Sequence, residues 1–512
     1  MKYGRSMRRD ICEKNRREDE SVEAYQYEGD WRPYAFLEEK SGFASLEMIQ
    51  NRYLCADMSG KLEYGGIPIW SDGKHVCLNP ETVMTLILGG TGSGKSRNLI
   101  VQNIILNALA GESMVIMDIK GEFSTGSLSG VVRGTLEENG YQCFFLDYRT
   151  LEADGYNFLA VPYQMYRNGK KEEAAIMVNH VVKALRSIYK GSGGDPFWDL
   201  TASKYLTAVI MLLFEYCGRE EQVNMLTLET FTTERGCSYM KEMVEEYGAS
   251  DSVMAMLESV VSEPEKTRMS TLATVSSYLE VFLSNEKLLR MMSSSTFSVC
   301  DLFLKKTALF IIVPDEVDTY DRINGMVLQQ ISAALVSEAY QYGGVLPRRV
   351  NFICDEFCNY YIPNMGRNIS AQRSRNIRWT LVCQGKKQLE QVYGREADVI
   401  FANCKNIYFL SSPEEELLEY IARKAGTTRI TEDGTRQPVL TADMLRLMKR
   451  KDGYADVCFL AEGKVFVTKL PDISNYTCGM ERNKTYTIPK KEKKKPEIYR
   501  PSQLFLDYER RG

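Results

Sequence analysis

Short apolar runs alternate with amphipathic stretches in the first third of the chain. Residues 83–88 form a largely apolar run that ends in two glycines, which is typical of a fully buried strand. Residues 98–110 then place aliphatic side chains at helical spacing and end before Gly111. The same rhythm predicts a strand at 113–117, a helix at 129–139 and a strand at 143–146. Strands that alternate with helices predict a parallel α/β sheet.

The pattern changes after about Pro162 and returns near residue 308. Between these points, helical periodicity predicts helices at 172–189, 197–217, 226–247 and 267–292. The later part predicts strands at 308–313, 349–354, 379–383, 406–410, 457–461 and 464–469, with a helix at 324–340. We therefore expect an α/β fold in which an all-α domain is inserted between the early and late strands.

This pattern predicts five segments. They are a charged N-terminal arm (1–41), the first part of the α/β domain (42–161), the inserted all-α domain (162–295), the second part of the α/β domain (296–476) and a basic C-terminal tail (477–512). Glycine-rich turns over 42–80 predict a lead-in hairpin of short strands. The lysine run at 490–495 predicts that the tail is solvated.

Composition excludes several classes of protein. With 44% hydrophobic and 26% charged residues, the 512-residue chain is typical of soluble proteins, and its length predicts two or more packed units. No apolar run approaches the roughly 20 residues that cross a bilayer, and the first residues carry no signal peptide. If the protein works at a membrane, we expect a separate anchor protein to hold it there. A net charge of −4 restricts any contact with nucleic acid to a local patch or channel.

The 13 cysteines include no CxxC pair, and the chain has only two histidines. This set argues against structural zinc and against hydrolases that use a Ser–His–Asp or Cys–His pair. Many cysteines lie in apolar stretches, which favours buried free thiols in a reducing cytosol. Examples are Cys217, Cys354, Cys383 and Cys404.

The strongest chemical signal is the pattern G-x-x-x-x-G-K-[ST] between the first predicted strand and helix. It comprises Gly89, Gly90, Thr91, Gly92, Ser93, Gly94, Lys95 and Ser96. The glycines let backbone N–H groups converge on phosphate oxygens, and the positive end of the helix adds to the anion site. Lys95 is expected to reach the β- and γ-phosphates of ATP, and Ser96 to bind Mg²⁺. A chance glycine-rich turn is the alternative.

A second signal is the apolar strand that ends in Asp355 and Glu356. Asp355 is expected to hold Mg²⁺, and Glu356 to orient and deprotonate the attacking water. A solvated acidic turn after a strand is the alternative, and the P-loop makes it less favoured. The strand at 113–117 leads into Asp118 and Glu122, which either lie near the nucleotide or simply cap a turn.

Hydrolysis also needs donors for the charge that develops on the γ-phosphoryl group. Gln384, at the end of another predicted strand, is a candidate for sensing this phosphate or positioning water. Arg373 or Arg375 is a candidate arginine finger into a neighbouring subunit, although surface arginines without such a role are the more common case.

In this order, the motifs resemble those of type IV secretion coupling proteins, the TraG/TraD-type conjugative DNA-transfer ATPases. The matching segments cover most of residues 42–475 and read LGGTGSGKS (88–96), VIMDIKGE (115–122), DPFWD (195–199), EKTRMSTLATVSSYLEVF (265–282), NFICDEF (351–357), ISAQRSRNIRWTLVCQGKKQLEQVYG (369–394) and DVIFANCKNIYFL (398–410). The resemblance implies a RecA-like P-loop NTPase domain with an inserted all-α domain. It assigns Lys95 and Ser96 to the Walker A motif and Asp355 and Glu356 to the Walker B motif.

The resemblance further implies a hexameric, ATP- and Mg²⁺-dependent motor. Such a motor works in the cytoplasm, peripheral to the inner face of the cell membrane, and delivers relaxase-bound single-stranded DNA to the secretion channel. Many members begin with transmembrane helices, which this chain lacks, so either a separate membrane partner or a soluble branch of the family is expected.

Three other functions stay open at this stage. One is a double-stranded DNA translocase of the chromosome-partitioning type. Another is a nucleotide-stabilised recruitment platform for secretion substrates, and the third is a secretion ATPase that handles protein alone.

Overall fold

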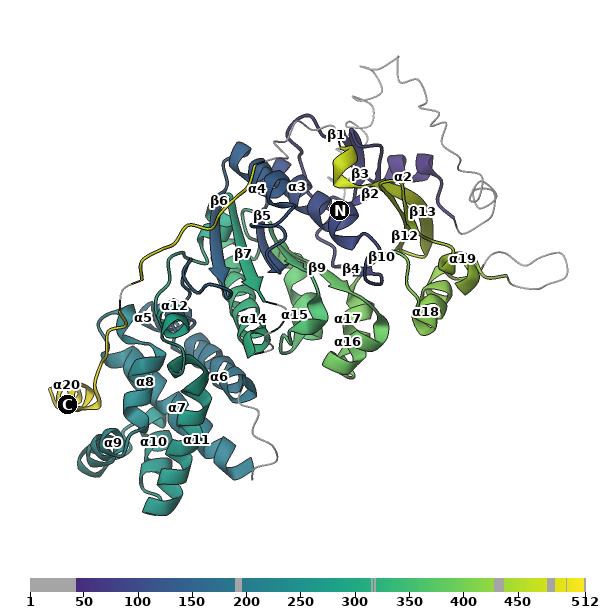
Figure 1. The fold of residues 1–512 in the computed structure, drawn as a ribbon. Coiled ribbons are helices and arrows are strands. Elements are labelled where there is room, and N and C mark those ends of the chain that lie inside the picture. Colours follow the sequence, from purple (N-terminus) through teal and green to yellow (C-terminus); the bar gives the residue numbers. More distant parts are fainter. Residues whose placement is uncertain are drawn as a thin grey trace.

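The computed structural model describes residues 43–188, 196–314, 316, 319–427, 437–476, 484–493 and 495–510. The predicted arm at 1–41 lies outside these residues. A large sheet with helices on both faces occupies one part of the molecule, and a separate group of helices lies beside it (Figure 1). A small three-stranded sheet packs near one end of the large sheet (Figure 1).

The large sheet is parallel over seven strands, as the alternation of apolar runs and helices predicts. Its spatial order is β6-β7-β5-β8-β9-β4-β10, followed by β12, which is antiparallel to β10. β11 and β13 pair with β12 and complete the sheet. The strands are β4 (Thr85–Leu88), β5 (Ser113–Ile119), β6 (Gln142–Asp147), β7 (Thr307–Val313), β8 (Val350–Cys354), β9 (Ile377–Cys383), β10 (Asn406–Phe409), β11 (Arg450–Lys451), β12 (Tyr454–Ala461) and β13 (Lys464–Pro471).

The parallel strands are apolar throughout because both of their faces are covered. Side chains alternate between two hydrophobic clusters: Leu86 and Leu88 of β4 join one, and Ile87 joins the other. One face carries a π-helical turn, η2 (Ser96–Ile100), with α3 (Val101–Leu109) and α4 (Ser129–Glu138). The other face carries α14 (Thr319–Ala339), α15 (Met365–Gln372), α16 (Lys386–Tyr393), α17 (Glu396–Asn403) and α18 (Glu415–Ala425). α19 (Ala442–Arg446) packs on α18.

The helical unit lies in sequence between β6 and β7, where an inserted segment is predicted. It comprises α5 (Ala160–Arg167), α6 (Lys171–Ile188), α7 (Pro196–Tyr216), α8 (Met225–Thr232), α9 (Glu234–Tyr247), α10 (Ser252–Val261), α11 (Glu265–Leu283) and α12 (Glu286–Met291). Among the described residues, α7 alone is long and apolar enough to cross a membrane, and 67% of its most apolar window is buried inside the unit. It packs against α6, α10 and α11 as the core helix of the unit.

Two predicted helices of this unit are wrong in extent because each contains an internal cap. Thr233 accepts a hydrogen bond from Gly236 N through its hydroxyl (3.0 Å), which divides 226–247 into α8 and α9. Asn285 accepts one from Leu288 N (3.1 Å), which divides 267–292 into α11 and α12. Each side chain replaces the intrahelical partner that a first-turn N–H lacks.

The lead-in hairpin is a three-stranded antiparallel sheet preceded by α2 (Leu46–Arg52). Its strands are β1 (Leu54–Asp57), β2 (Pro68–Ser71) and β3 (His75–Leu78). Cys55 and Cys77 lie directly opposite each other in β1 and β3 and form a disulfide. The expectation of free thiols is therefore wrong for Cys55 and Cys77. The pairing of β1 with β3 places them opposite each other, although they are 22 residues apart in sequence. The four cysteines expected as buried free thiols, Cys217, Cys354, Cys383 and Cys404, are buried and unbonded.

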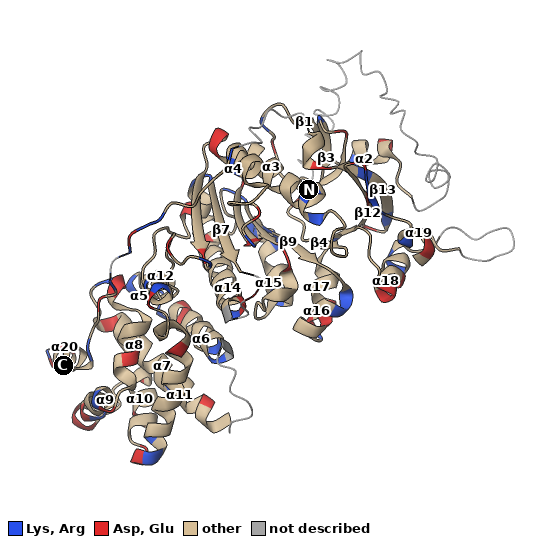
Figure 2. Cartoon of the chain, in the orientation of Figure 1, with Lys and Arg blue, Asp and Glu red and all other residues tan. Residues whose placement is uncertain are grey.

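The described lysines of the C-terminal run, Lys490, Lys491 and Lys495, are exposed as predicted and Lys493 is half-buried, but the segment that carries them docks on the rest of the molecule. Residues 484–493 and 495–510, which we call the strap, run along the sheet domain and end in α20 (Pro501–Glu509) on the helical unit (Figure 1). Tyr486, Tyr499 and Leu504 are buried and anchor the strap, while the neighbouring lysines can keep their charged ends in water. Several of those lysines appear as blue segments between α4 and α20 in Figure 2.

Specific bonds fasten the strap at both ends. On the sheet domain, Arg133 donates to Thr487 O (2.9 Å), and Lys491 pairs with the buried Asp154 (2.5 Å). On the helical unit, Asn224 donates to Glu497 O (2.8 Å), and the ring of Tyr508 contacts that of Tyr216. The strap therefore joins both parts of the molecule.

Candidate active site

The glycine-rich loop after β4 has the backbone geometry that its sequence predicts. Gly92 and Gly94 adopt φ values of 76° and 100°, which side chains disfavour. A Cβ on Gly89 would lie 2.8 Å from Ser93 Oγ, so the loop is too tight there for a larger residue. The helix that follows begins at Ser96 with the π-helical turn η2, a distortion that is frequent at functional sites.

Lys95 is buried at the base of this loop. Its Nζ donates to the carbonyl oxygens of Gly89 (2.6 Å) and Gly90 (3.0 Å). Burial lowers the pKa of Lys95, whereas the nearby carboxylates of Glu356 and Asp355 oppose this shift. Ser93 Oγ is buried and has no partner among the described residues. The loop thus offers a cation, an unused hydroxyl and a glycine-lined cradle, a donor set that fits a phosphate chain.

Asp355 and Glu356 directly follow β8 and lie at the same edge of the sheet. Burial raises the pKa of Asp355 to about 7, the Glu356 carboxylate adds to this increase, and Lys95 opposes it. Asp355 Oδ1 accepts a hydrogen bond from Glu356 N (3.0 Å), and Tyr360 Oη donates to Asp355 O (3.0 Å). Glu356 has a φ of 45°, in the left-handed region that a non-glycine residue adopts only under constraint.

Gln384 joins the two motifs. β9 lies between β4 and β8, so the residue at its carboxyl end sits between the P-loop and the acidic pair. Gln384 Nε2 donates to Glu356 Oε2 (3.0 Å). Because neighbouring strands lie about 5 Å apart, β4 and β8 are separated by roughly 10 Å, a span that a magnesium–triphosphate group bridges. Carboxylate and hydroxyl oxygens are ligands that Mg²⁺ prefers, so Ser96 and Asp355 suit this ion.

The motif after β5 is divided between two roles. Asp118 caps a turn: its carboxylate accepts hydrogen bonds from Phe123 N (3.0 Å) and Ser124 N (2.8 Å). Burial raises the pKa of Asp118 to about 6. Glu122 is close enough to Asp355 to contribute to the raised pKa of that residue. The capping alternative therefore describes Asp118, whereas Glu122 belongs to the electrostatic surroundings of the site.

Arg373 and Arg375 do not join this site within the chain. They precede β9, whereas Gln384 follows it. They therefore lie at the opposite end of this strand, roughly 20 Å from Gln384. Arg375 Nη2 donates to Tyr340 Oη (2.6 Å), and its guanidinium lies 4.9 Å from the centre of that ring. Arg373 approaches Glu81 at 3.9 Å. A role for either arginine in a neighbouring subunit stays a prediction.

Four residues around the P-loop come from distant segments and belong to no motif that the sequence shows. Ser411 O accepts a hydrogen bond from Gly90 N (2.9 Å), and Glu414 Oε1 accepts one from Lys387 N (3.3 Å) at the start of α16. On the other side of the loop, Arg450 and Asp472 form an ion pair (2.6 Å). The only local sequence signal is the Asp452–Gly453 dipeptide, which indicates a tight hairpin beside Arg450.

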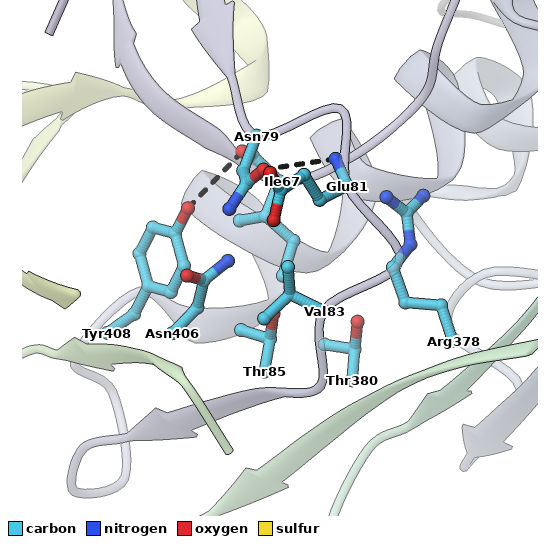
Figure 3. Close-up of a pocket in the computed structure, with 9 residues that line it drawn as sticks. All are labelled: Ile67, Asn79, Glu81, Val83, Thr85, Arg378, Thr380, Asn406 and Tyr408. Carbon is cyan, nitrogen blue, oxygen red and sulfur yellow. Dashed lines mark hydrogen bonds between the residues drawn. The ribbon is translucent and has the colours of Figure 1, made fainter. Parts of the chain in front are cut away.

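A separate polar pocket lies at the amino ends of β4, β9 and β10 (Figure 3). Its lining includes Thr85, Thr380, Asn406 and Arg378. Its volume of about 10 Å³ accommodates roughly one water molecule, so it is far too small for a nucleotide. Arg378 also forms an ion pair with the buried Glu112 (2.9 Å), which makes this pocket part of a structural network.

The fold and this site together define a RecA-like P-loop NTPase with an all-helical domain. The family model described as type IV secretory system conjugative DNA transfer matches residues 39–449. The chain therefore belongs to this family, as its motifs predict. A comparison with curated proteins gives no match.

Solved structures of TrwB share the fold. The plasmid coupling protein TrwB in complex with a non-hydrolysable ATP analogue superposes with a TM-score of 0.55 at 16% identity, over 87% of this chain and 96% of that chain. TrwB in complex with ADP and Mg²⁺ gives 0.55 at 16% identity, over 89% and 95% of the two chains. The bacterial conjugative coupling protein TrwB in complex with sulphate gives 0.56 at 17% identity, over 84% and 97%.

Proposed function

We propose that this protein is an ATP-hydrolysing coupling protein of conjugative type IV secretion that delivers relaxase-bound single-stranded DNA to the transfer channel. The observation that carries the proposal is the hydrogen bond from Gln384 to Glu356 at the sheet edge beside Lys95. A general base held next to a phosphate cradle serves hydrolysis, whereas nucleotide binding alone does not need it.

Each residue then has a distinct task. Lys95 leaves the carbonyl oxygens of the loop and pairs with the β- and γ-phosphates of ATP. Ser96 and Asp355 would hold Mg²⁺, which would supply positive charge to the phosphate oxygens. Glu356 takes a proton from the attacking water as the water oxygen bonds to the γ-phosphorus and the bond to the β-phosphate oxygen breaks. Gln384 fixes the Glu356 carboxylate in the orientation that this proton transfer requires.

The working assembly that we propose is a homo-oligomer, most simply a hexamer. It works in the cytoplasm at the inner face of the cell membrane, with a separate anchor protein and the components of the secretion channel as partners. In the assembly, Arg373 or Arg375 reaches the nucleotide of a neighbouring subunit. Single-stranded DNA then binds mainly through its backbone charge, which makes contact insensitive to sequence. The TrwB structures with an ATP analogue and with ADP and Mg²⁺ support the nucleotide part of this proposal.

The variant Glu356→Gln tests the motor. We expect ATP binding to be retained, steady-state ATP turnover to fall by at least 100-fold because the base is lost, and DNA transfer in a mating assay to stop. Glu419→Gln, at an exposed position on α18, is the matched control and should behave as wild type. Transfer that continues without hydrolysis would instead support the recruitment platform.

ATP turnover measured with increasing protein concentration tests the assembly and the substrate. Turnover per chain that rises steeply with concentration would support catalysis shared between subunits. Stimulation by single-stranded DNA supports the coupling function, whereas stimulation by duplex DNA alone favours a double-stranded translocase. No response to any DNA favours a secretion ATPase that handles protein alone.

A further inference from the structure

A three-residue ion cluster adjoins the P-loop on the side away from Glu356. Asp472, which follows β13, is only 2% exposed. Its carboxylate accepts hydrogen bonds from Arg97 Nε and Nη2 (both 2.7 Å) and from Arg450 Nη2 (2.6 Å). The three residues are separated by up to 375 positions in sequence, so the fold alone assembles them.

Contacts with the loop and its helix fix the cluster beside the phosphate cradle. Arg97 directly follows Ser96 in η2. Arg450 Cδ lies 3.1 Å from the position that a Cβ on Gly94 would occupy. Asn98 Nδ2 donates to Leu470 O (3.0 Å), which fastens the start of the helix to the end of β13. Movement of the P-loop and movement of this cluster are therefore mechanically linked.

A tight hairpin holds Arg450 in position. β11 and β12 pair Arg450 with Ala455 and Lys451 with Tyr454, and they are joined by Asp452 and Gly453. These two turn residues have φ values of 53° and 77°, as a two-residue turn with left-handed centres requires. Asp472 N also donates to Gly453 O (2.6 Å), so the hairpin and the carboxylate support each other.

The cluster carries an excess positive charge. Burial alone would raise the pKa of Asp472, but hydrogen bonds from Arg97 and Ser474 hold it well below its usual range, so the carboxylate stays ionised. Within the cluster one carboxylate faces two guanidinium groups, and the nearby Glu122 also raises the pKa of Arg97. Arg97 uses two N–H groups on Asp472, whereas Arg450 uses one of its five in bonds among the described residues. Arg450 thus has N–H donors next to the P-loop that form no hydrogen bond with the described residues.

We propose that Arg450 binds the phosphate chain of the nucleotide held by its own subunit, with Asp472 and Arg97 as the positioning residues. The ligand class is a nucleoside di- or triphosphate, and the proposal rests on the proposed ATP site. Arg450 supplies a fixed guanidinium on the face of the loop opposite Lys95. The two side chains then contact the phosphates from two sides. Since the contact is present before and after hydrolysis, it contributes to affinity more than to turnover.

Calorimetric titration with ADP and Mg²⁺ tests the proposal. In Arg450→Gln we expect the Kd for ADP to rise about tenfold at low salt, and the difference from wild type to shrink at high salt. Arg450→Lys, which keeps the charge, should recover part of the loss. Lys451→Gln is the matched control, because it removes one charge from the exposed neighbouring position of the same strand, and it should bind ADP as wild type does.

Two results would overturn the role of Arg450. One is an unchanged Kd for ADP in Arg450→Gln; the other is equal weakening in the Lys and Gln variants, which would mean that shape rather than charge matters. Failure of the proposed function looks different: wild type and Lys95→Ala would then both fail to bind ADP or ATP. Thermal melting of each variant checks that the hairpin is folded.

Discussion

At the scale of single residues, the candidate active site contains one constrained backbone conformation. Glu356 occupies the left-handed region although it is not glycine, and Gln384 holds its side chain from the next strand. Such strain costs on the order of 1 kcal/mol or more and persists only where neighbours impose it. Here the conformation directs the carboxylate of Glu356 toward Gln384 while the adjacent Asp355 stays buried.

Asp118 gives a pH-dependent prediction at the same scale. Its raised pKa means that the folded protein binds this proton more tightly than the unfolded chain, so stability falls as pH rises from about 4 through about 6. The difference of about two pKa units corresponds to roughly 3 kcal/mol. In Asp118→Asn, which carries no charge at any pH, this part of the pH dependence should disappear.

Thermal melting of wild type and Asp118→Asn between pH 4 and pH 7 measures the effect. We expect the melting temperature of wild type to fall relative to the variant as pH increases. Parallel curves for the two proteins would contradict a buried carboxyl that titrates near pH 6.

Sequence alone predicts the residues of contiguous motifs and misses those assembled from afar. Lys95 and Ser96 stand in one uninterrupted pattern, and Asp355 and Glu356 end an apolar strand, so each is recognisable locally. Arg450 and Asp472 carry no such pattern, because their role follows from the pairing of β11, β12 and β13.

At the scale of elements, α14 packs closely against the segment that follows the acidic pair. A Cβ on Gly325 of α14 would overlap the carbonyl oxygen of Tyr361, a backbone atom that cannot turn aside. Glycine in a helix normally costs about 1 kcal/mol relative to alanine. At this position the close approach reverses that preference.

Gly325→Ala should therefore lower the free energy of unfolding by about 1–3 kcal/mol, as overpacking does. It should also lower ATP turnover, because the displaced segment directly follows Glu356 in the chain. Gly218→Ala is the control, since a Cβ there meets no atom within 4 Å. Chemical denaturation and steady-state turnover measure the two effects. If Gly325→Ala were as stable as the control, α14 would be able to move away from Tyr361 without lowering the free energy of unfolding.

Each parallel strand is predicted as one element, whereas two predicted helices each comprise two helices, for a physical reason. The central strands are buried on both faces, so their apolar runs are nearly continuous and easily recognised. The division of the helical unit depends on single capping side chains such as Thr233 and Asn285. The lysine-rich composition of the strap suggests solvent exposure, whereas a few spaced aromatic residues dock it.

At the scale of the whole molecule, the strap crosses the segment that leads from β6 into the helical unit. Lys491 N donates to Glu152 O (2.8 Å), and Lys493 Nζ donates to Leu151 O (2.9 Å). Burial lowers the pKa of Lys493 to about 8. These contacts hold the strap on the segment that connects the sheet to the helical unit.

The double variant Lys491→Met/Lys493→Met should loosen this connection. We expect amide hydrogen exchange at residues 151–157 to increase about tenfold or more, with exchange in β4 and β5 unchanged, because the side-chain bonds of Lys491 to Asp154 and of Lys493 to Leu151 O are lost. Lys495→Met, an exposed position on the same strap, is the control. Unchanged exchange at 151–157 would mean that the helical unit holds its position without the strap lysines.

The order of synthesis gives the strap a further consequence. Residues 484–510 leave the ribosome after every segment that they contact, from Arg133 on α4 to Tyr508's partners on α7 and α9. The sheet and the helical unit are therefore both synthesised before the strap that joins them. Docking of the strap is then a late event in the assembly of these segments, because all of its partners precede it in the chain.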